Sequence, residues 1–204
     1  MKLITALRTA LFPIQLLGAL LVLAGAAAYA QTPAPTEEPS TLILSDTLNY
    51  DDLKKQSIFT GSVVLTRGLM TLHADRLDVR EDAAGNQFGN AKGNKGRVVT
   101  IRQERPETFE LIEGTGLRAE YNSSTSEFDL IGQAVVTRHV CGKPFDTIRG
   151  ERIRYNDKTG TYHAQGGANS AAAGGRVRSF AEPRAKVDVA IAECRKAKQA
   201  PKQR

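Results

Sequence analysis

The sequence has no tryptophan, only two cysteines among its 204 residues, and 6% aromatic residues. Two cysteines are too few for a small fold held together by a dense disulfide framework. Beyond the N-terminus, no apolar run approaches the roughly 20 residues that a membrane-spanning helix needs, which excludes a polytopic membrane protein. The formal net charge is +6 without a long block of one sign, so an anionic partner is permitted but not required.

The N-terminus has the layout of a cleavable secretory signal over residues 1–30. A short basic stretch precedes an apolar run from Leu11 through Ala28, and alanines stand one and three residues before a predicted cut after Ala30. An uncleaved N-terminal anchor is the alternative. Residues 31–40 contain three prolines and are expected to form an extended leader to the folded part. We therefore expect an exported chain.

Export makes a disulfide possible between the only two cysteines, Cys141 and Cys194. The bond would close a loop of 53 positions. In the chain-entropy description, such a loop stabilises the fold by about 4 kcal/mol through its constraint on the unfolded chain. Two separate thiols remain the alternative.

Apolar residues alternate with polar ones from Thr41 onward, with the two-residue period of β-strands. Leu48 and Tyr50 share one side of a predicted strand, and Phe59 and Val63 share one side of the next. Clusters of Asp, Asn, Ser and Gly fall between the apolar runs and predict turns. The pattern predicts an all-β domain of short antiparallel strands over residues 41–192.

The C-terminal part of the sequence is less regular. Residues 166–175 are rich in Gly and Ala and predict a flexible or thinly packed connection. The alternation of Val187, Val189 and Ile191 suggests a last strand. Residues 193–204 carry several basic residues and are predicted to form a flexible tail.

A weak internal repeat joins a tyrosine to a glycine eleven residues later. The three pairs are Tyr50 and Gly61, Tyr121 and Gly132, and Tyr155 and Gly166. A degenerate fourth copy has Val79 in the tyrosine position and Phe88 after the turn. Each unit is a two-strand element that cannot bury its apolar face alone, so we expect stacked hairpins. The recurrent glycine suggests a bulge or corner, or a place where a side chain would obstruct the interior.

Several segments in this order resemble the OstA-like (LptA) family of periplasmic lipopolysaccharide transport proteins. The resemblance covers about residues 42–165 and rests on the secretory leader, Leu44–Tyr50, Phe59–Val63, Ala74–Leu77, Gly132–Val135 and Gly166. It implies an open, slightly twisted β-jellyroll that binds lipopolysaccharide by its lipid A acyl chains. It also implies head-to-tail self-association into a bridge across the periplasm, from an inner-membrane LptC-like component to an outer-membrane LptD-like translocon.

The family resemblance and strand parity together predict which residues line a lipid-binding groove. For any one of them, ordinary core packing is the alternative. The predicted groove residues are Leu48, Tyr50, Phe59, Val63, Leu65, Leu77, Val79, Tyr121, Phe128, Ile153, Tyr155 and Tyr162. Basic residues at the rim are candidates for holding lipid phosphates, with a solvated strand face as the alternative. They are Arg67, Arg76, Arg118 and Arg138, followed by Lys143, Arg149, Arg152 and Arg154.

Two other functions are compatible with an exported β-domain. A periplasmic β-sandwich that binds glycans would favour exposed aromatic residues, and the absence of Trp weighs against it. A hydrolase would need a catalytic group such as His139 or an aspartate. His139 and Cys141 share a strand face, but no third ligand stands at a suitable spacing for a metal. We therefore expect no enzyme activity, cofactor or metal.

Overall fold

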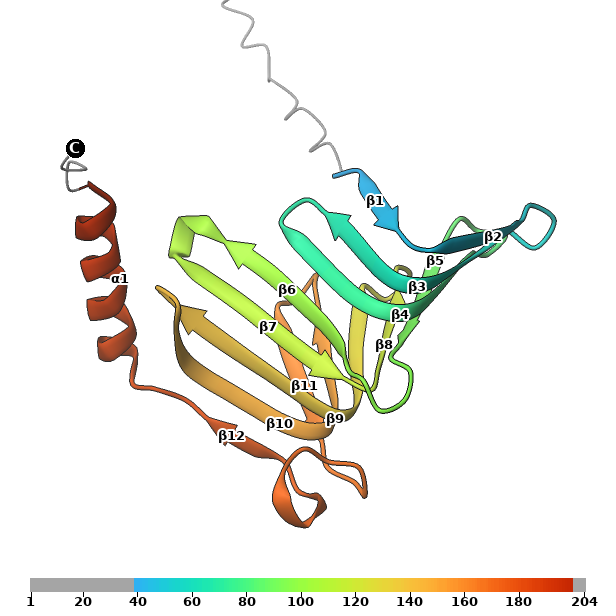
Figure 1. Ribbon diagram of the computed structural model, residues 1–204. Coiled ribbons are helices and arrows are strands. Elements are labelled where there is room, and N and C mark those ends of the chain that lie inside the picture. Colours follow the sequence, from blue (N-terminus) through green and yellow to red (C-terminus); the bar gives the residue numbers. More distant parts are fainter. Residues whose placement is uncertain (1–38, 200–204) are drawn as a thin grey trace, which may run out of the picture. The chain divides into compact units, whose positions relative to one another are not determined.

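A computed structural model describes residues 39–199. The predicted signal peptide and all but the last two residues of the predicted leader lie outside this range. Twelve strands in the described range form one antiparallel sheet, followed by a C-terminal helix (Figure 1). The observed all-β fold agrees with the sequence prediction. No helix within residues 39–199 is both long enough and apolar enough to span a bilayer.

The strands differ widely in length, and four of them are long. The bounds are β1 Thr41–Leu44, β2 Thr47–Asp51, β3 Gln56–Arg67, β4 Met70–Glu81, β5 Gln87–Lys92, β6 Val99–Arg105, β7 Glu110–Gly116, β8 Arg118–Asn122, β9 Glu127–Val140, β10 Lys143–Asn156, β11 Thr161–Gln165 and β12 Arg178–Phe180. The helices are two short 3₁₀ turns, η1 Pro106–Thr108 and η2 Ala173–Gly175, and α1 Arg184–Gln199.

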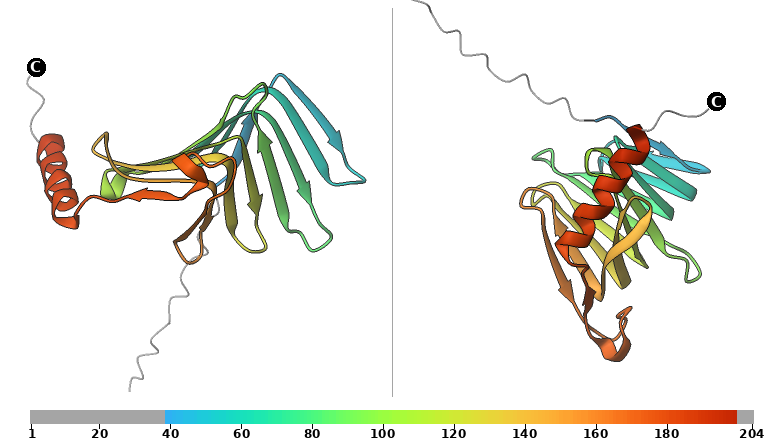
Figure 2. Two further views of the ribbon diagram at one scale, coloured as in Figure 1. Left: turned by 90° about the horizontal axis from the view of Figure 1, so that it is seen from below. Right: turned by 90° about the vertical axis from the view of Figure 1, so that its left-hand side faces the viewer.

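The long strands β3, β4, β9 and β10 each take part in two half-sheets, because their two ends pair with different neighbours. Half-sheet 1 has the order β2-β3-β4-β5-β8-β9-β10-β11, and half-sheet 2 has the order β1-β3-β4-β6-β7-β9-β10-β12. The two half-sheets meet at an angle (Figure 2). Buried residues from both halves, such as Leu77 and Ile101, belong to one core cluster. The apolar faces of the two half-sheets therefore face each other.

Glycines mark the bends of two long strands. The register of β3 shifts between Thr60 and Val63, and Gly61 in this step has a φ of +81°. Gly132 in β9, with a φ of +74°, lies where the register with β10 shifts. A Cβ at Gly132 would lie 3.0 Å from the Leu117 side chain. The bulge expected from the recurrent glycines is therefore present in two of the three repeats, whereas Gly166 follows the end of β11.

The strand register explains why the tyrosine and glycine of each repeat are eleven residues apart. Each tyrosine lies directly opposite the residue seven positions later, and the glycine follows four positions after that residue. The opposed pairs are Tyr50 and Ser57, Tyr121 and Phe128, and Tyr155 and Tyr162. In the fourth copy Val79 lies opposite Gly89, so the glycine at the equivalent position is Gly93, just after the end of β5, and the turn is three residues longer. Phe88 faces the other side of the sheet, which corrects its place in the predicted repeat.

The C-terminal prediction was wrong, because residues 184–199 form helix α1 and not a strand followed by a flexible tail. Alanine, lysine, arginine and glutamate, which favour helices, dominate this segment. The apolar residues also fit a helix, since Val187 is 6% exposed while Val189 is 58% exposed. The strand prediction took Val187, Val189 and Ile191 as one face, although Val187, Ile191 and Cys194 have helical spacing.

A disulfide between Cys141 and Cys194 fastens α1 to the turn between β9 and β10. The amino group of Lys198 also lies 4.7 Å from the centre of the Phe109 ring, beside η1. Val140 at the end of β9 and Val187 in α1 are both buried, and α1 contacts β9. The helix is thus held at the end of half-sheet 2 by the disulfide, by the Lys198–Phe109 interaction and by contacts with β9.

The bend at Gly132 gives a test of the architecture. Gly132→Ala should lower the free energy of unfolding by about 2 kcal/mol, since a left-handed backbone costs a residue with a Cβ about 1–2 kcal/mol and the Leu117 contact adds to this. Gly85→Ala is the matched control, because Gly85 has a φ of +82° and open space around its Cβ position. Urea unfolding monitored by circular dichroism measures both; equal losses would show that the Leu117 contact contributes nothing.

Candidate functional site

A row of apolar side chains crosses half-sheet 1 close to the bend, on the face toward half-sheet 2. Residues in successive strands lie directly opposite one another in the register, and we call them the deep row. Its members are Leu48, Phe59, Leu77, Ala91, Ala119, Leu130, Ile153 and Ala164. The five central members, from Leu77 to Ile153, are almost fully buried, whereas Leu48 at the edge is 57% exposed. The deep row is therefore the innermost part of this apolar face.

A second row lies two residues farther from the bend on the same face. This aromatic row contains Tyr50, Ser57, Val79, Gly89, Tyr121, Phe128, Tyr155 and Tyr162. Its central members are half-buried, and its end members Tyr50 and Tyr162 are 58% and 41% exposed. The rings of Tyr155 and Tyr162 contact each other in a tilted arrangement, with 4.7 Å between centroids and 36° between the ring planes. The face thus changes from buried aliphatic to partly exposed aromatic with distance from the bend.

Half-sheet 2 supplies the opposite wall. Val63 is buried next to the bend, and a row that includes Leu65, Leu72, Ile101, Val136 and Ile148 crosses the half-sheet. All of these side chains belong to, or pack against, the cluster that contains the deep row. The two walls with their partly exposed outer ends form what we call the trough. All twelve predicted groove residues lie on its two walls.

Charged residues follow these apolar rows toward the open end of half-sheet 2. Arg67 and Arg138 occupy the same cross-strand row, two residues beyond Leu65 and Val136. Arg138 donates hydrogen bonds of 2.6 Å to both Glu110 and Asp146. Burial raises the pKa of the Tyr162 phenol, and the charges of Arg105 and Glu110 act on it from the other half-sheet. A polar rim therefore borders the apolar trough on this side.

Comparison with known families identifies the chain. The family model described as "LptA/(LptD N-terminal domain) LPS transport protein" matches residues 42–161, which is more than half of the sequence. The chain belongs to this family. Its members are described as lipopolysaccharide transport proteins, which is a transport role and not a catalytic one. No curated protein matches the chain.

A solved structure shares the fold of this LptA-family chain. It is LptH from Pseudomonas aeruginosa, described as the LptA-homologous periplasmic component of the lipopolysaccharide transport device. The similarity has a TM-score of 0.59 at 21% identity and covers 71% of this chain and 96% of LptH. The LptA-like β-jellyroll expected from the sequence is thus the observed fold.

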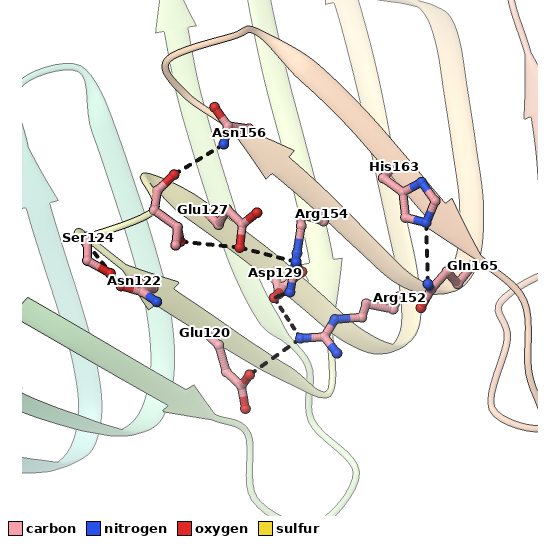
Figure 3. A network of polar contacts seen from close by, with 11 residues as sticks. Glu120, Asn122, Ser124, Glu127, Asp129, Arg152, Arg154, Asn156, His163 and Gln165 are labelled. Carbon is pink, nitrogen blue, oxygen red and sulfur yellow. Dashed lines mark hydrogen bonds and ion pairs between the residues drawn. The ribbon is translucent and has the colours of Figure 1, made fainter.

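The opposite face of half-sheet 1 carries a polar network in this LptA-family chain. Asp129 is 5% exposed, although it lies between two inward-facing residues in β9. Arg152 donates a hydrogen bond of 2.7 Å to its carboxylate, and Arg154 donates two of 2.9 Å (Figure 3). Glu120 and Glu127 add ion pairs to the same arginines. The network ties β8, β9 and β10 together behind the trough.

The structure corrects the expected position of several rim arginines. Arg76 and Arg118 lie on the face opposite the deep row, where they form ion pairs with Asp78 and Glu120. Arg152 and Arg154 are held there by Asp129, and Arg149 lies on the outer face of half-sheet 2, next to the inward-facing Ile148. Only Arg67 and Arg138 of the four main candidates border the trough. Strand parity alone predicts this position. Arg76 stands next to the inward-facing Leu77 and Arg118 next to the inward-facing Ala119, so both arginine side chains point to the opposite face.

Sequence reasoning missed the smallest members of the rows. Ala91, Ala119 and Ala164 belong to the deep row, and Gly89 to the aromatic row. Small residues give no strong hydrophobic signal, and only the register with large partners identifies them. Cys141, which the sequence analysis placed on one strand face with His139, is in a disulfide. Residues 39–199 contain no cluster of three or more His, Cys, Asp or Glu residues arranged to hold a metal ion.

The Asp129 network predicts a pH-dependent loss of stability. Burial alone would raise the pKa of Asp129, but the hydrogen bonds from Arg154 and Arg152 outweigh it and hold the pKa below its usual value of 3.8. A lowered pKa means that the carboxylate stabilises the fold above about pH 4 and that this contribution is lost as the pH falls further. Asp129→Asn should lower the free energy of unfolding by about 3 kcal/mol at pH 7, since it removes the buried charge that accepts three hydrogen bonds from Arg152 and Arg154.

Urea unfolding of the native protein and the Asp129→Asn variant at pH 7 and pH 3 measures this effect. The difference between the two proteins should shrink at pH 3. Asp157→Asn is the control, because Asp157 lies in an exposed turn and forms no ion pair with the described residues. A difference of the same size at both pH values would show that the charge of Asp129 does not contribute.

Proposed function

We propose that this chain is a periplasmic carrier that shields the acyl chains of lipopolysaccharide in the trough and passes them toward the outer membrane. Membership of the LptA/LptD N-terminal family supports the transport role. The observation that carries the proposal is the aromatic row, because it leaves apolar rings partly exposed between two walls. An apolar face that served only as a core would be expected to exclude water along its whole length.

The energetics of acyl chains favour such a face. Each methylene left in water costs about 0.8 kcal/mol, so ten methylenes cost about 8 kcal/mol. Tyr50, Phe128 and Tyr162 offer contact surface without directional bonds, which suits a cargo that must be released again. Gly89 carries no side chain between Val79 and Tyr121 of the aromatic row. We place the sugar and phosphate groups outside the trough.

The free strand edges support the proposed bridge. Among the described residues, β1 and β2 pair only with β3, and β11 and β12 pair only with β10. Unpaired backbone groups on such edges can accept a strand from another chain. Pairing the last strands of one copy with the first strands of the next would continue both half-sheets and both apolar rows. We propose that LptC-like and LptD-like partners dock at the two ends of this assembly.

Photo-crosslinking in cells tests the carrier function. A photoreactive amino acid at Tyr50 or Phe128 should yield an adduct with lipopolysaccharide, because both side chains face the trough. Asn49 is the matched control, since it neighbours Tyr50 in β2 and points to the opposite face. The carrier proposal fails if neither inward position gives an adduct, or if Asn49 crosslinks as strongly as Tyr50.

Sedimentation velocity tests the bridge. Because a heterologous contact does not close on itself, the sedimentation coefficient should rise continuously with protein concentration and should not stop at a dimer. A Leu42→Pro variant, which places proline in the edge strand β1, should reduce this rise. A strictly monomeric profile at millimolar protein would contradict end-to-end association.

A further inference from the structure

Most arginines of the sheet are neutralised by carboxylates within the same sheet. The ion pairs join Arg76 to Asp78, Arg102 to Glu113, Arg105 to Glu110, Arg118 to Glu120, Arg138 to Glu110 and Asp146, and Arg152 and Arg154 to Asp129. Such arginines have little positive charge left to offer a ligand. An arginine cluster without carboxylates is therefore an exception in this sheet.

Three arginines near the C-terminal edge of half-sheet 2 form such a cluster. Arg149 in β10, Arg178 in β12 and Arg176 just before β12 line one pocket of about 300 Å³. Within residues 39–199, none of the three forms an ion pair. The rest of the lining consists of Ala171, Ala172, Ala173 and Val177, which carry no charge.

The strand register places two of these arginines directly opposite one another. Arg149 and Arg178 are direct partners in the antiparallel ladder of β10 and β12. Like charges at directly opposite positions destabilise a sheet. The sequence thus carries an unfavourable charge pair at a point where the neighbouring pairs, Ile148 with Ser179 and Thr147 with Phe180, carry no charge.

The connection between β11 and β12 holds the third arginine in place. The sequence predicted a flexible or thinly packed segment, but several of its backbone groups form hydrogen bonds. The N–H of Gly167 donates to the carbonyl of Gly175 at 2.8 Å, and the N–H of Ala171 donates to the carbonyl of Gly150 at 3.1 Å. The Ser170 hydroxyl donates to the carbonyl of Arg176 at 2.6 Å. These bonds fix the backbone of Arg176 beside β10, while the three alanines leave the pocket open.

We propose that this pocket, the arginine pocket, binds a phosphate monoester group. Guanidinium groups bind phosphate oxygens in a bidentate manner, and three of them compensate a dianion. A bound anion would also remove the repulsion between Arg149 and Arg178. The pocket lies on the face opposite the trough, so it does not compete with the acyl chains for space. Phosphate binding by the pocket does not depend on the proposed function. The assignment of the phosphate to the phosphorylated sugar of the cargo does rest on it.

Thermal unfolding of the full exported chain tests the pocket without any lipid. Inorganic phosphate at about one hundred times its Kd, at constant ionic strength adjusted with chloride, should raise Tm by about 5 °C. Arg178→Gln should lose most of this increase and weaken phosphate binding about ten- to hundredfold. In phosphate-free chloride the same variant should be at least as stable as the native protein, because the like-charge pair is gone.

Lys158→Gln is the matched control, since it removes one positive charge from the exposed turn between β10 and β11. It should keep the full phosphate effect. The proposal is overturned if phosphate acts no more strongly than chloride, if Arg178→Gln keeps the full effect, or if succinate at equal charge stabilises equally, which would indicate a general anion surface or a site for an acidic protein segment.

A second titration identifies the source of the phosphate. Tighter binding of glucosamine 1-phosphate than of inorganic phosphate supports a pocket that reads a phosphorylated sugar. Equal affinities support a site for the phosphate group alone. Neither titration contains acyl chains. A failure of phosphate binding would therefore not affect the crosslinking result at Tyr50 and Phe128, and a failure of crosslinking would not affect the phosphate result.

Discussion

The structure depends on bending one sheet so that its single apolar face is turned against itself. A flat sheet of this length would expose the whole deep row to water, and no second layer exists in the described residues to cover it. The long strands solve this by running through both half-sheets, with bulges at Gly61 and Gly132 where the backbone adopts positive φ. Each bend brings a buried residue such as Leu77 toward one such as Ile101. The need to bury this one apolar face therefore explains the core packing, the bends and the trough.

The same constraint explains the chemistry of the two faces. Alternation along each strand sends large apolar residues inward and charged residues outward, so the wall of the trough and the Asp129 network are made by neighbouring residues. Phe128, Asp129 and Leu130 illustrate this, with the carboxylate between two trough residues in sequence and on the opposite face in space. An exposed apolar trough needs a rigid support, and the ion pairs that join β8, β9 and β10 provide one.

Much of the fold and of the trough lining was predictable from the sequence, because it depends on patterns within single strands and hairpins. The two-residue period identified the inward positions of β2, β3, β8 and β10, and the tyrosine-to-glycine spacing reflects a hairpin whose turn has a fixed length. Gly93 was missed because the turn before β5 is three residues longer, which shifts the spacing. Ala91 and Ala119 were missed because their burial comes from neighbours distant in sequence. Helix α1 was mistaken for a strand because Val187, Val189 and Ile191 alternate with the two-residue period of a strand, while Val187 and Ile191 also have helical spacing.

The tyrosines of the chain offer the most direct measurement of the central claim, which is that acyl chains occupy the trough. The sequence has no tryptophan, and its four tyrosines beyond the predicted signal peptide all stand in the aromatic row. Tyrosine fluorescence of the exported chain therefore reports on this face alone. Lipopolysaccharide with a nitroxide on an acyl chain should quench it strongly at stoichiometric amounts, whereas a nitroxide on the sugar should quench it weakly. Equal quenching by both, or none by the acyl label, would contradict the account.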